Sequence, residues 1–383
     1  MHTKTLLAFV ALTCSAVACG GEPPPPPAPP PPPPPAEPPP AASATEAPPP
    51  AAPAKPSMAD LVPQTLKNVT DAFNAHDSQK FAANFTADAV QTEYGVGEAH
   101  GRDEIAKNFQ RLFDASSDAK GGAARLFAKG NVIAVDWVTT GTMTGDLMGM
   151  KATKKPFGLH RLVITSLNDD GLMTGSHEYT DELGAVAQMK GMKEAPPVAT
   201  LPATTEWHVA KNTPDEDKLA DWMKTENDAF NKDDPKALSA LLTAEGDVTF
   251  YFAGAKVLKA GKDFDKFNAD FFKAIPKAQF AISSVWAADG YVIAERTITG
   301  ALKGRLGPAA PTGKDVTLHA GEIFQATSDG KVEHAWAFGN IGEVMPPPPP
   351  PKVAAEKKPA AGDKADKATD KKPAAPATPA PKK

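Results

Sequence analysis

The chain has 383 residues, a net charge of −5, 41 prolines and only two cysteines. An acidic folded region with a locally basic C-terminal tail argues against nucleic acid as a partner. The eight histidines show no pairing at metal-ligand spacing, and no glycine-rich phosphate loop is present. The sequence therefore predicts neither a metal nor a cofactor, and it predicts a folded part stabilised by packing without disulfides.

Residues 1–18 have the pattern of a signal peptide. A short basic start precedes an apolar run, Leu6–Ala18, that is too short to span a bilayer comfortably. The run ends in "AVAC", which resembles the lipobox of bacterial lipoproteins and implies that Cys19 carries lipid and anchors the chain to a membrane. Because Gly20 rather than an aspartate follows, the resemblance implies the outer membrane of the cell envelope. An ordinary cleaved signal with an incidental cysteine is the alternative.

Two segments lack the residues that build a core. Residues 19–57 are rich in proline and alanine, and residues 346–383 are rich in proline, alanine and lysine. Such compositions cannot bury enough apolar surface to offset the entropy of ordering. We expect a disordered stalk between the lipid and the folded part, and a disordered tail after it.

The region between these segments is duplicated. The tetrapeptide "DAFN" at Asp71–Asn74 returns at Asp228–Asn231, and Gly101 returns as Gly261 before a charged helical segment. The strings "VIA", "LH" and "DG" also recur in the same order at nearly constant spacing. The order predicts two domains of the same fold, over residues 58–195 and 215–345, joined by a linker at 196–214.

Each copy predicts helices followed by strands. In the first helix, apolar side chains share one face at helical spacing; they are Val62, Leu66, Val69 and Phe73. A short second helix in the second copy begins with Asp234 as N-cap and Pro235 at the first helical position. After a strand and a third helix, long β-branched segments predict antiparallel strands. The fold class is α+β, with a curved sheet wrapped around helices.

This order resembles the nuclear transport factor 2-like fold, and the first copy is similar to its SnoaL-like polyketide cyclase branch. The stretches that carry the resemblance are "GRDEIAKNFQRLFDA" at 101–115, "GTMTG" at 141–145 and "YTDELGAVAQMKG" at 179–191, with "PTGKDV" at 311–316 in the second copy. The resemblance implies two cone-shaped domains whose wide end holds an apolar pocket. The fold hosts isomerases, cyclases and binding modules alike, so it does not decide an activity.

The last strand of the first copy carries candidate site residues. His177, Tyr179 and Asp181 share one face, and we place that face toward the cone. The resemblance implies that Asp181 acts as general acid/base next to a carbonyl. The alternative is that Asp181 caps the helix that follows it. Met143 stands where the cyclase branch usually has histidine, and this apolar side chain weakens the case for catalysis.

The second copy has a different set at the matching positions. Trp336, Phe338 and Asn340 replace the imidazole, the phenol and the carboxylate. An amide cannot exchange protons near neutral pH, so the second cone cannot perform the same acid/base chemistry. Its aromatic side chains suit a packed interface or an apolar ligand.

The sequence favours non-catalytic binding of a small apolar molecule, or association with a protein, over catalysis. The rival interpretation is a SnoaL-like cyclase or isomerase that uses Asp181 of the first domain. Two modes of association stay open, which are pairing of the two domains within the chain and dimerisation with another chain.

Overall fold

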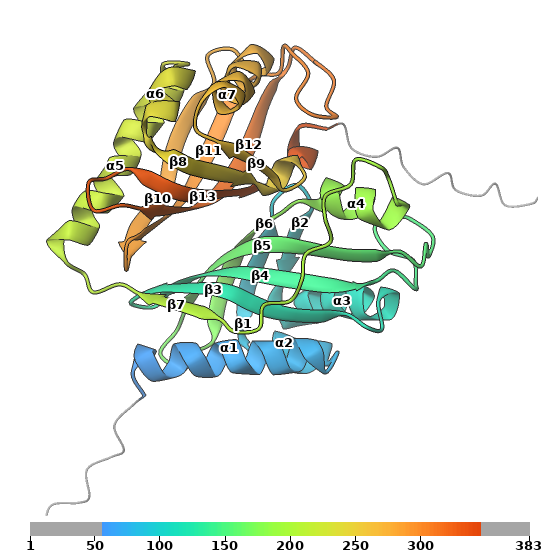
Figure 1. Cartoon of the computed structure of the whole chain (residues 1–383). Helices are drawn as coiled ribbons and strands as arrows, with labels where there is room; N and C mark the ends of the chain where they lie inside the picture. The colour runs from blue at the N-terminus through green and yellow to red at the C-terminus, as the bar shows by residue number, and fades with distance from the viewer. Residues whose placement is uncertain (1–55, 346–383) are drawn as a thin grey trace, which may run out of the picture. The chain divides into compact units, whose positions relative to one another are not determined.

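The computed structural model describes residues 56–345, so the predicted signal peptide, almost all of the predicted stalk and the predicted tail lie outside the described residues. The first repeat begins with three helices interleaved with two strands and continues as a meander of strands (Figure 1). Its elements are α1 (Met58–Asn74), α2 (Ser78–Ala82), β1 (Phe85–Glu93), β2 (Gly97–His100), α3 (Gly101–Ala115), β3 (Lys120–Lys129), β4 (Val132–Thr142), β5 (Pro156–Leu167), β6 (Met173–Thr180) and α4 (Glu182–Lys190).

The second repeat follows the same order after a short strand in the predicted linker. Its elements, with that strand first, are β7 (Glu206–Val209), α5 (Pro214–Asn231), α6 (Pro235–Ala240), β8 (Leu242–Phe250), η1 (Tyr251–Ala253), β9 (Lys256–Lys259), α7 (Lys262–Ala274), β10 (Gln279–Ala288), β11 (Tyr291–Ala301), β12 (Asp315–Ala326), β13 (Val332–Gly339) and η2 (Ile341–Val344). The predicted α+β class and the tandem duplication are confirmed. No helix within residues 56–345 is long and apolar enough to cross a membrane.

The two sheets have equivalent strand orders. The first runs β2-β1-β6-β5-β4-β3-β7 and the second runs β10-β11-β12-β13-β8-β9, which is the same order read from the other end without a counterpart of β7. In each repeat one parallel pair, β1 with β6 or β8 with β13, brings the first and last strands together. This pairing places the first and last strands of each repeat inside its sheet, whose edges are β2 and β7 in the first repeat and β10 and β9 in the second.

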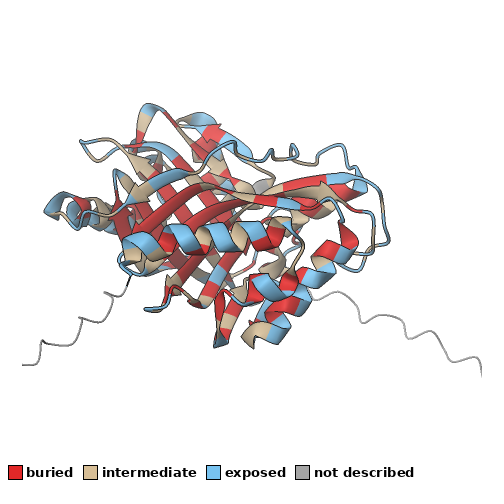
Figure 2. Ribbon diagram, turned by 90° about the horizontal axis from the view of Figure 1, so that it is seen from below, coloured by how far each residue is buried: buried red, intermediate tan, exposed pale blue. Residues whose placement is uncertain are grey.

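The helices begin where the sequence places caps. The side chain of Asp234 accepts hydrogen bonds from two backbone N–H groups of α6, and Pro235 occupies the first turn, as predicted. Helix α5 begins with a capping box, in which Thr213 and Glu216 satisfy each other's backbone N–H groups. Figure 2 shows that the strands carry most of the buried positions, whereas the helices alternate between buried and exposed ones.

The helices of the first repeat pack on their sheet through aromatic rings. Phe73 of α1 lies at the centre, with its ring edge-on to four others at centroid distances of 5.3 to 6.2 Å. Those four are Phe81, Phe109, Phe113 and Trp137. Edge-to-face aromatic pairs add stabilisation beyond the area that they bury.

The other face of each sheet packs against the other repeat. A cluster of buried side chains draws on both repeats there; its buried members are Phe127, Ala134, Leu162, Ile164, Tyr179, Trp286, Ala288, Ile293, Ile323 and Phe338. All described residues belong to one compact unit. The layers are therefore helices, sheet, sheet and helices, and the pairing of domains within the chain is the mode of association that the structure contains (Figure 1).

A buried carboxylate lies at the equivalent position on each side of this interface. Asp136 of β4 accepts hydrogen bonds from the guanidinium of Arg125 at 2.6 Å and from His160 at 2.8 Å. Glu295 of β11 accepts one from the hydroxyl of Tyr179 and one from the ring of His177, both at 2.7 Å. The first carboxylate is paired within its own repeat, whereas the second is paired across the interface.

A histidine ring of each repeat stacks on a tyrosine ring of the other. His160 of the first repeat stacks on Tyr251 of the second with centroids 4.6 Å apart, and His319 of the second stacks on Tyr94 of the first at 4.1 Å. These histidines belong to the repeated "LH" string of the sequence and lie at equivalent positions of β5 and β12. Their role in the structure is to build the contact between the repeats.

Gly321 of β12 lies close to side chains of the first repeat. A Cβ atom at this position would lie 2.6 Å from Cδ2 of Tyr179 and 2.8 Å from Cδ2 of Leu162. Gly321→Ala should therefore lower the free energy of unfolding by about 1–3 kcal/mol through overpacking.

The matched control for Gly321→Ala is Gly122→Ala. A Cβ atom at Gly122 would meet nothing closer than 3.7 Å, so this change should leave the melting temperature unchanged or slightly raised. Thermal melts of both variants and the parent test the prediction. Equal melting temperatures in all three proteins would show that the two sheets are not packed as closely as described.

Candidate functional site

A cavity of about 360 Å³ lies inside the first repeat, between its sheet and helices α1 and α3. Aromatic and aliphatic side chains line most of it, including Phe81, Phe109 and Trp137. Val96 and Met148 line its mouth and are 56% and 42% exposed, so the cavity reaches the surface beside them. Its size and lining are those of a small-molecule site.

One wall of the cavity is polar. The guanidinium of Arg161 on β5 donates to Glu178 of β6 at 2.6 Å and lies 3.2 Å from a carboxylate oxygen of Glu93 of β1. Glu178 is 3% exposed, and its other oxygen accepts a hydrogen bond from Gln91 at 2.6 Å. Glu182, at the start of α4, adds a third carboxyl group to this wall.

Three carboxyl groups and one guanidinium lie on this wall, which we call the polar wall: Gln91, Glu93, Arg161, Glu178, Thr180 and Glu182. Burial raises the pKa of Glu178 above its usual range, although Arg161 opposes the shift. Burial, together with the charge of Glu93, raises the pKa of Glu182 to about 7. The wall can therefore hold a proton near neutral pH and can both donate and accept hydrogen bonds.

The second repeat has no equivalent site. The space inside its cone is about 40 Å³. Arg161 of β5 is paired with Thr180 of β6. The equivalent pair of the second repeat is Ala320 of β12 with Gly339 of β13. Glu178 of β6 is paired with Glu93 of β1. The equivalent residue of β13, Ala337, is paired with Phe250 of β8. The polar wall is thus replaced by small and apolar residues.

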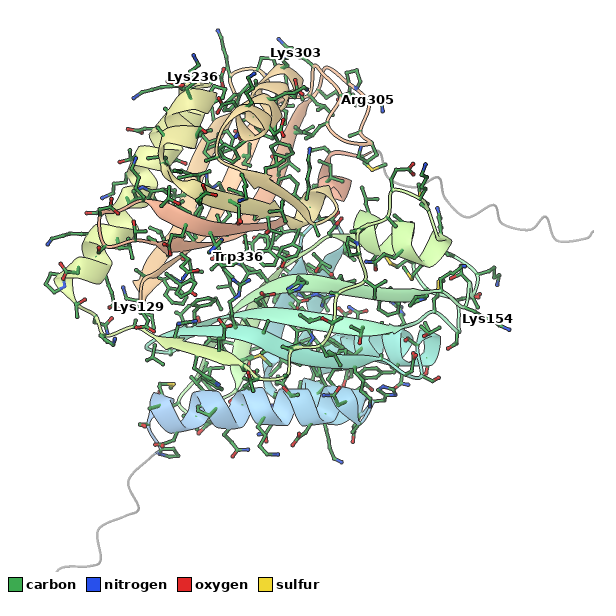
Figure 3. All side chains as sticks on the ribbon, viewed as in Figure 1. Lys129, Lys154, Lys236, Lys303, Arg305 and Trp336 are labelled. Carbon is green, nitrogen blue, oxygen red and sulfur yellow. The ribbon has the colours of Figure 1, made fainter. Side chains whose placement is uncertain are left out.

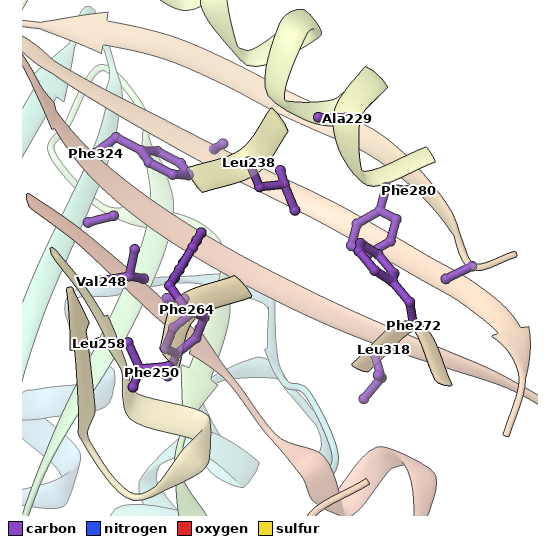
Figure 4. Packing of buried hydrophobic residues seen from close by; sticks show 14 of the residues in the cluster. Ala229, Leu238, Val248, Phe250, Leu258, Phe264, Phe272, Phe280, Leu318 and Phe324 are labelled. Carbon is purple, nitrogen blue, oxygen red and sulfur yellow. The ribbon is translucent and has the colours of Figure 1, made fainter. Parts of the chain in front are cut away.

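Large side chains fill the second cone instead. Figure 4 shows Phe250, Phe264, Phe272, Phe280 and Phe324 spread through the core between the helices and the sheet. Beside them the guanidinium of Arg296, which is 1% exposed, pairs with the carboxylates of Glu226 and Glu322. The volume that is open in the first cone is therefore occupied in the second.

The orientation that the sequence analysis gave to the last strand was wrong. We placed His177 and Tyr179 toward the cone, but both contact Glu295 of the second repeat. The cavity is lined by the alternate positions, Glu178 and Thr180. Alternation separates the two faces of a strand, but it does not say which face meets the helices and which meets another sheet.

Asp181 lies outside this cavity and caps α4, as the alternative hypothesis predicted. Its side chain accepts a hydrogen bond from the backbone N–H of Gly184 at 2.8 Å. It lines a separate groove of about 320 Å³ between the repeats, with His160 and Tyr251. Burial raises the pKa of Asp181 to about 6. The general acid/base role that the resemblance implied stays a prediction.

The remaining predicted residues do not line the large cavity either. Met143 is fully buried in a small cluster with Phe157, Ala185 and Met189, behind the cavity wall. Trp336 points toward the first repeat, where the guanidinium of Arg125 lies 3.6 Å from its ring centroid (Figure 3).

Phe338 and Asn340 have the same structural roles in the second copy as Tyr179 and Asp181 have in the first. Phe338 packs on Tyr251 within the inter-repeat cluster, as Tyr179 packs on the interface from the other side. Asn340 caps the 3-10 helix η2, as Asp181 caps α4. The duplicated positions thus keep structural roles, which are interface packing and capping.

The polar wall was missed because its residues are ordinary in sequence. Glu178 sits between the residues that were singled out, and Arg161 follows the repeated histidine by one position. A signal was nevertheless present, because a glutamate and an arginine in long strands of buried residues need partners. Among residues 56–345, no group of three or more histidine, cysteine or acidic side chains is placed to hold a metal ion.

The fold and the cavity define a cone-shaped α+β domain with an internal, mostly apolar cavity. The family model for the SnoaL-like polyketide cyclase matches residues 64–189 and again 220–345, more than half of the chain. The chain therefore belongs to the SnoaL-like polyketide cyclase family and carries two copies of its domain in tandem. No curated protein matches the sequence.

Solved structures similar to one repeat include three bacterial proteins. TsrD from Streptomyces laurentii is 17% identical and covers 34% of this chain and 96% of its own, with a TM-score of 0.32. IdmH from Streptomyces antibioticus is 23% identical and covers 33% and 97%, with a TM-score of 0.30. A protein with a ketosteroid isomerase-like fold from Catenulispora acidiphila is 16% identical and covers 33% and 93%, with a TM-score of 0.30.

The capping role of Asp181 leads to a pH prediction. Because burial raises its pKa to about 6, the folded protein holds the proton more tightly than the unfolded chain, so this group lowers stability as the pH rises from about 4 to about 6. Asp181→Asn cannot ionise and still caps the helix, so it should remove this part of the pH dependence. At pH 8 it should melt at or above the temperature of the parent.

Asp181→Ala is the contrasting variant, because it removes both the charge and the cap. It should cost about 1 kcal/mol at pH 4, where the parent carboxyl is protonated, relative to Asp181→Asn. Melting curves between pH 4 and pH 8 measure all three proteins. A melting temperature of Asp181→Asn well below that of the parent at pH 8 would contradict the assigned role.

Proposed function

We propose that this chain binds a small, largely apolar molecule inside the first repeat, and that the second repeat serves as the packing partner of the first sheet. The observation that carries the proposal is the contrast between the two cones. A cavity of about 360 Å³ in one repeat corresponds to about 40 Å³ in the other. Protein interiors are close-packed, so a large apolar cavity that opens to the surface is costly to keep unless it is used.

Catalysis with Asp181 is not favoured as the alternative function. The carboxylate lies outside the cavity, and one of its oxygens is engaged by the backbone of α4. A general base must come within hydrogen-bond distance of the proton that it removes. A molecule held in the first cone does not bring its reacting atoms to Asp181, so binding without turnover is the simpler function.

Filling the cavity should abolish binding. Val135 and Val163 face each other on β4 and β5, and both line the cavity. The double variant Val135→Phe/Val163→Phe should weaken binding of the neutral probe N-phenyl-1-naphthylamine at least tenfold, because the rings occupy the space of the ligand. Fluorescence titration of the fragment from residue 56 to residue 345 measures the affinity.

The control for this experiment is Ala294→Val, which adds apolar volume to the filled cone of the second repeat. It should leave the affinity for the probe within about twofold of the parent, with melting curves showing that both variants fold. Probe binding that survives in the double variant, or that is lost equally in Ala294→Val, would place the ligand elsewhere.

The proposed place of action is the cell envelope, with lipid on Cys19 as the membrane anchor. The support is the sequence alone, because Cys19 follows a short apolar run and small residues and precedes a proline-rich segment. Cys19→Ala should move the protein from the membrane fraction to the soluble fraction of the bacteria that express it. Parent protein that is already soluble and carries no acyl mass on this cysteine would overturn the anchor.

A further inference from the structure

Glu182 on the polar wall is a carboxyl group without a cationic partner. It begins α4, is partly buried and lines the cavity of the first repeat. No cationic side chain of the described residues lies within ion-pair distance of it, and it accepts one hydrogen bond there, from the amide of Asn340 at 3.4 Å. A carboxylate that is removed from water without a counter-ion costs free energy, so it calls for an explanation.

The buried guanidinium of the wall is already shared by two other carboxylates. Nη1 of Arg161 donates to Glu178 at 2.6 Å, and Nη2 lies 3.2 Å from a carboxylate oxygen of Glu93. The side chain of Glu93 also lines the cavity and is 23% exposed, so a ligand can reach it. Burial raises the pKa of Glu182 and the negative charge of Glu93 adds to the shift, so these two carboxyl groups are close enough to repel each other.

The other cation of the cavity lining does not balance this charge. Arg111 of α3 is exposed, and its guanidinium lies 3.3 Å from the side-chain oxygen of Asn108. Water and salt screen an exposed charge more than they screen a buried one. The wall therefore holds three carboxyl groups against one buried guanidinium, and the space in front of it favours a positive charge.

Aromatic rings stand beside these carboxyl groups. Trp137 of β4 is paired with Arg161 of β5, so both side chains leave the sheet on the same face, and both line the cavity. Phe157, near the start of β5, lines the same space. The faces of aromatic rings attract organic cations, and nearby carboxylates add to the attraction. The open cavity indicates a ligand independently of the carboxyl groups, and their charge indicates which kind of ligand fits.

We propose that the ligand of the first repeat is an organic cation, with an ammonium group beside the carboxylates of Glu93 and Glu182 and an apolar body in the aromatic part of the cavity. This assignment rests on the proposed function and adds the charge of the ligand and the residues that recognise it. In the second repeat Phe250 stands at the position of Glu93, and Ile341 begins η2 where Glu182 begins α4. Recognition of the charge therefore belongs to the first repeat alone.

Three probes of similar shape test the assignment by displacing N-phenyl-1-naphthylamine from the purified protein. They are trimethyl(naphthalen-2-ylmethyl)ammonium, its neutral isostere 2-neopentylnaphthalene, in which carbon replaces the charged nitrogen, and the anion naphthalene-2-acetate. At pH 8 the cation should bind at least as tightly as the neutral isostere, although water solvates the ammonium group more strongly. The anion should bind at least tenfold more weakly than the cation.

Glu182→Gln keeps the shape of the side chain and removes its charge. It should lower the ratio of the cation's affinity to that of the neutral isostere about tenfold at pH 8. Glu93→Gln is the second variant and should lower the ratio in the same direction. Glu194→Gln is the control, because Glu194 is exposed, follows the same helix and does not line the cavity, and it should leave the ratio unchanged.

The pH dependence of binding gives a second readout. Burial, with the charge of Glu93, raises the pKa of Glu182 to about 7, so this group gains its charge between pH 6 and pH 8. The affinity for the permanently charged cation should therefore rise about threefold over this range. Glu93, Arg161 and Asp181 are the charged groups that act on Glu182. Asp181→Asn should keep the rise, because Asp181 lies outside the cavity, whereas Glu182→Gln should lose it.

The outcomes separate this inference from the proposed function. Weaker binding of the cation than of the neutral isostere, tighter binding of the anion, or a ratio that both glutamine variants of the wall leave unchanged would overturn the cation site. Binding of the neutral isostere in those cases would leave the proposed function intact. Failure of all three probes and of N-phenyl-1-naphthylamine to bind would overturn the proposed function itself.

Discussion

The face of each sheet that its own helices leave uncovered is apolar, and each repeat covers that face of the other. A curved sheet with helices on one side only must bury its second face or expose a large apolar surface. Here the buried cluster around Leu162, Ile293 and Ile323 draws equally on both sheets. The duplication supplies within one chain the partner that this face needs.

This constraint assigns roles to the residues at the interface. The carboxylates of Asp136 and Glu295 are buried between the sheets, and each is held by ring or guanidinium donors. The hydrogen bond that the ring of His177 donates to Glu295 raises the pKa of this histidine, against the effect of burial. Burial, followed by the charge of Glu295, raises the pKa of Tyr179, which stays a neutral donor. These groups hold the interface and leave the cavities to other residues.

Because each sheet covers the same face of the other, the interiors of the two cones can differ. The first keeps open space and a polar wall around Arg161. The second places its buried guanidinium at Arg296 on a different strand and fills the remaining volume with phenylalanine side chains (Figure 4). Two copies of one fold thus enclose an open cavity in one case and a packed core in the other, and the difference depends on a few side chains.

The sequence alone determined the duplication, the α+β class, the order of the elements and caps such as Asp234, because these follow from local periodicity and from the chemistry of helix ends. Tertiary structure decided which face of β6 meets the cavity. A strand gives two sets of side chains, 177 and 179 or 178 and 180, and local pattern does not choose between two buried faces. The choice depends on the partner sheet, which is distant in sequence. The open first cone and the filled second cone were likewise decided by volumes summed over many strands and helices.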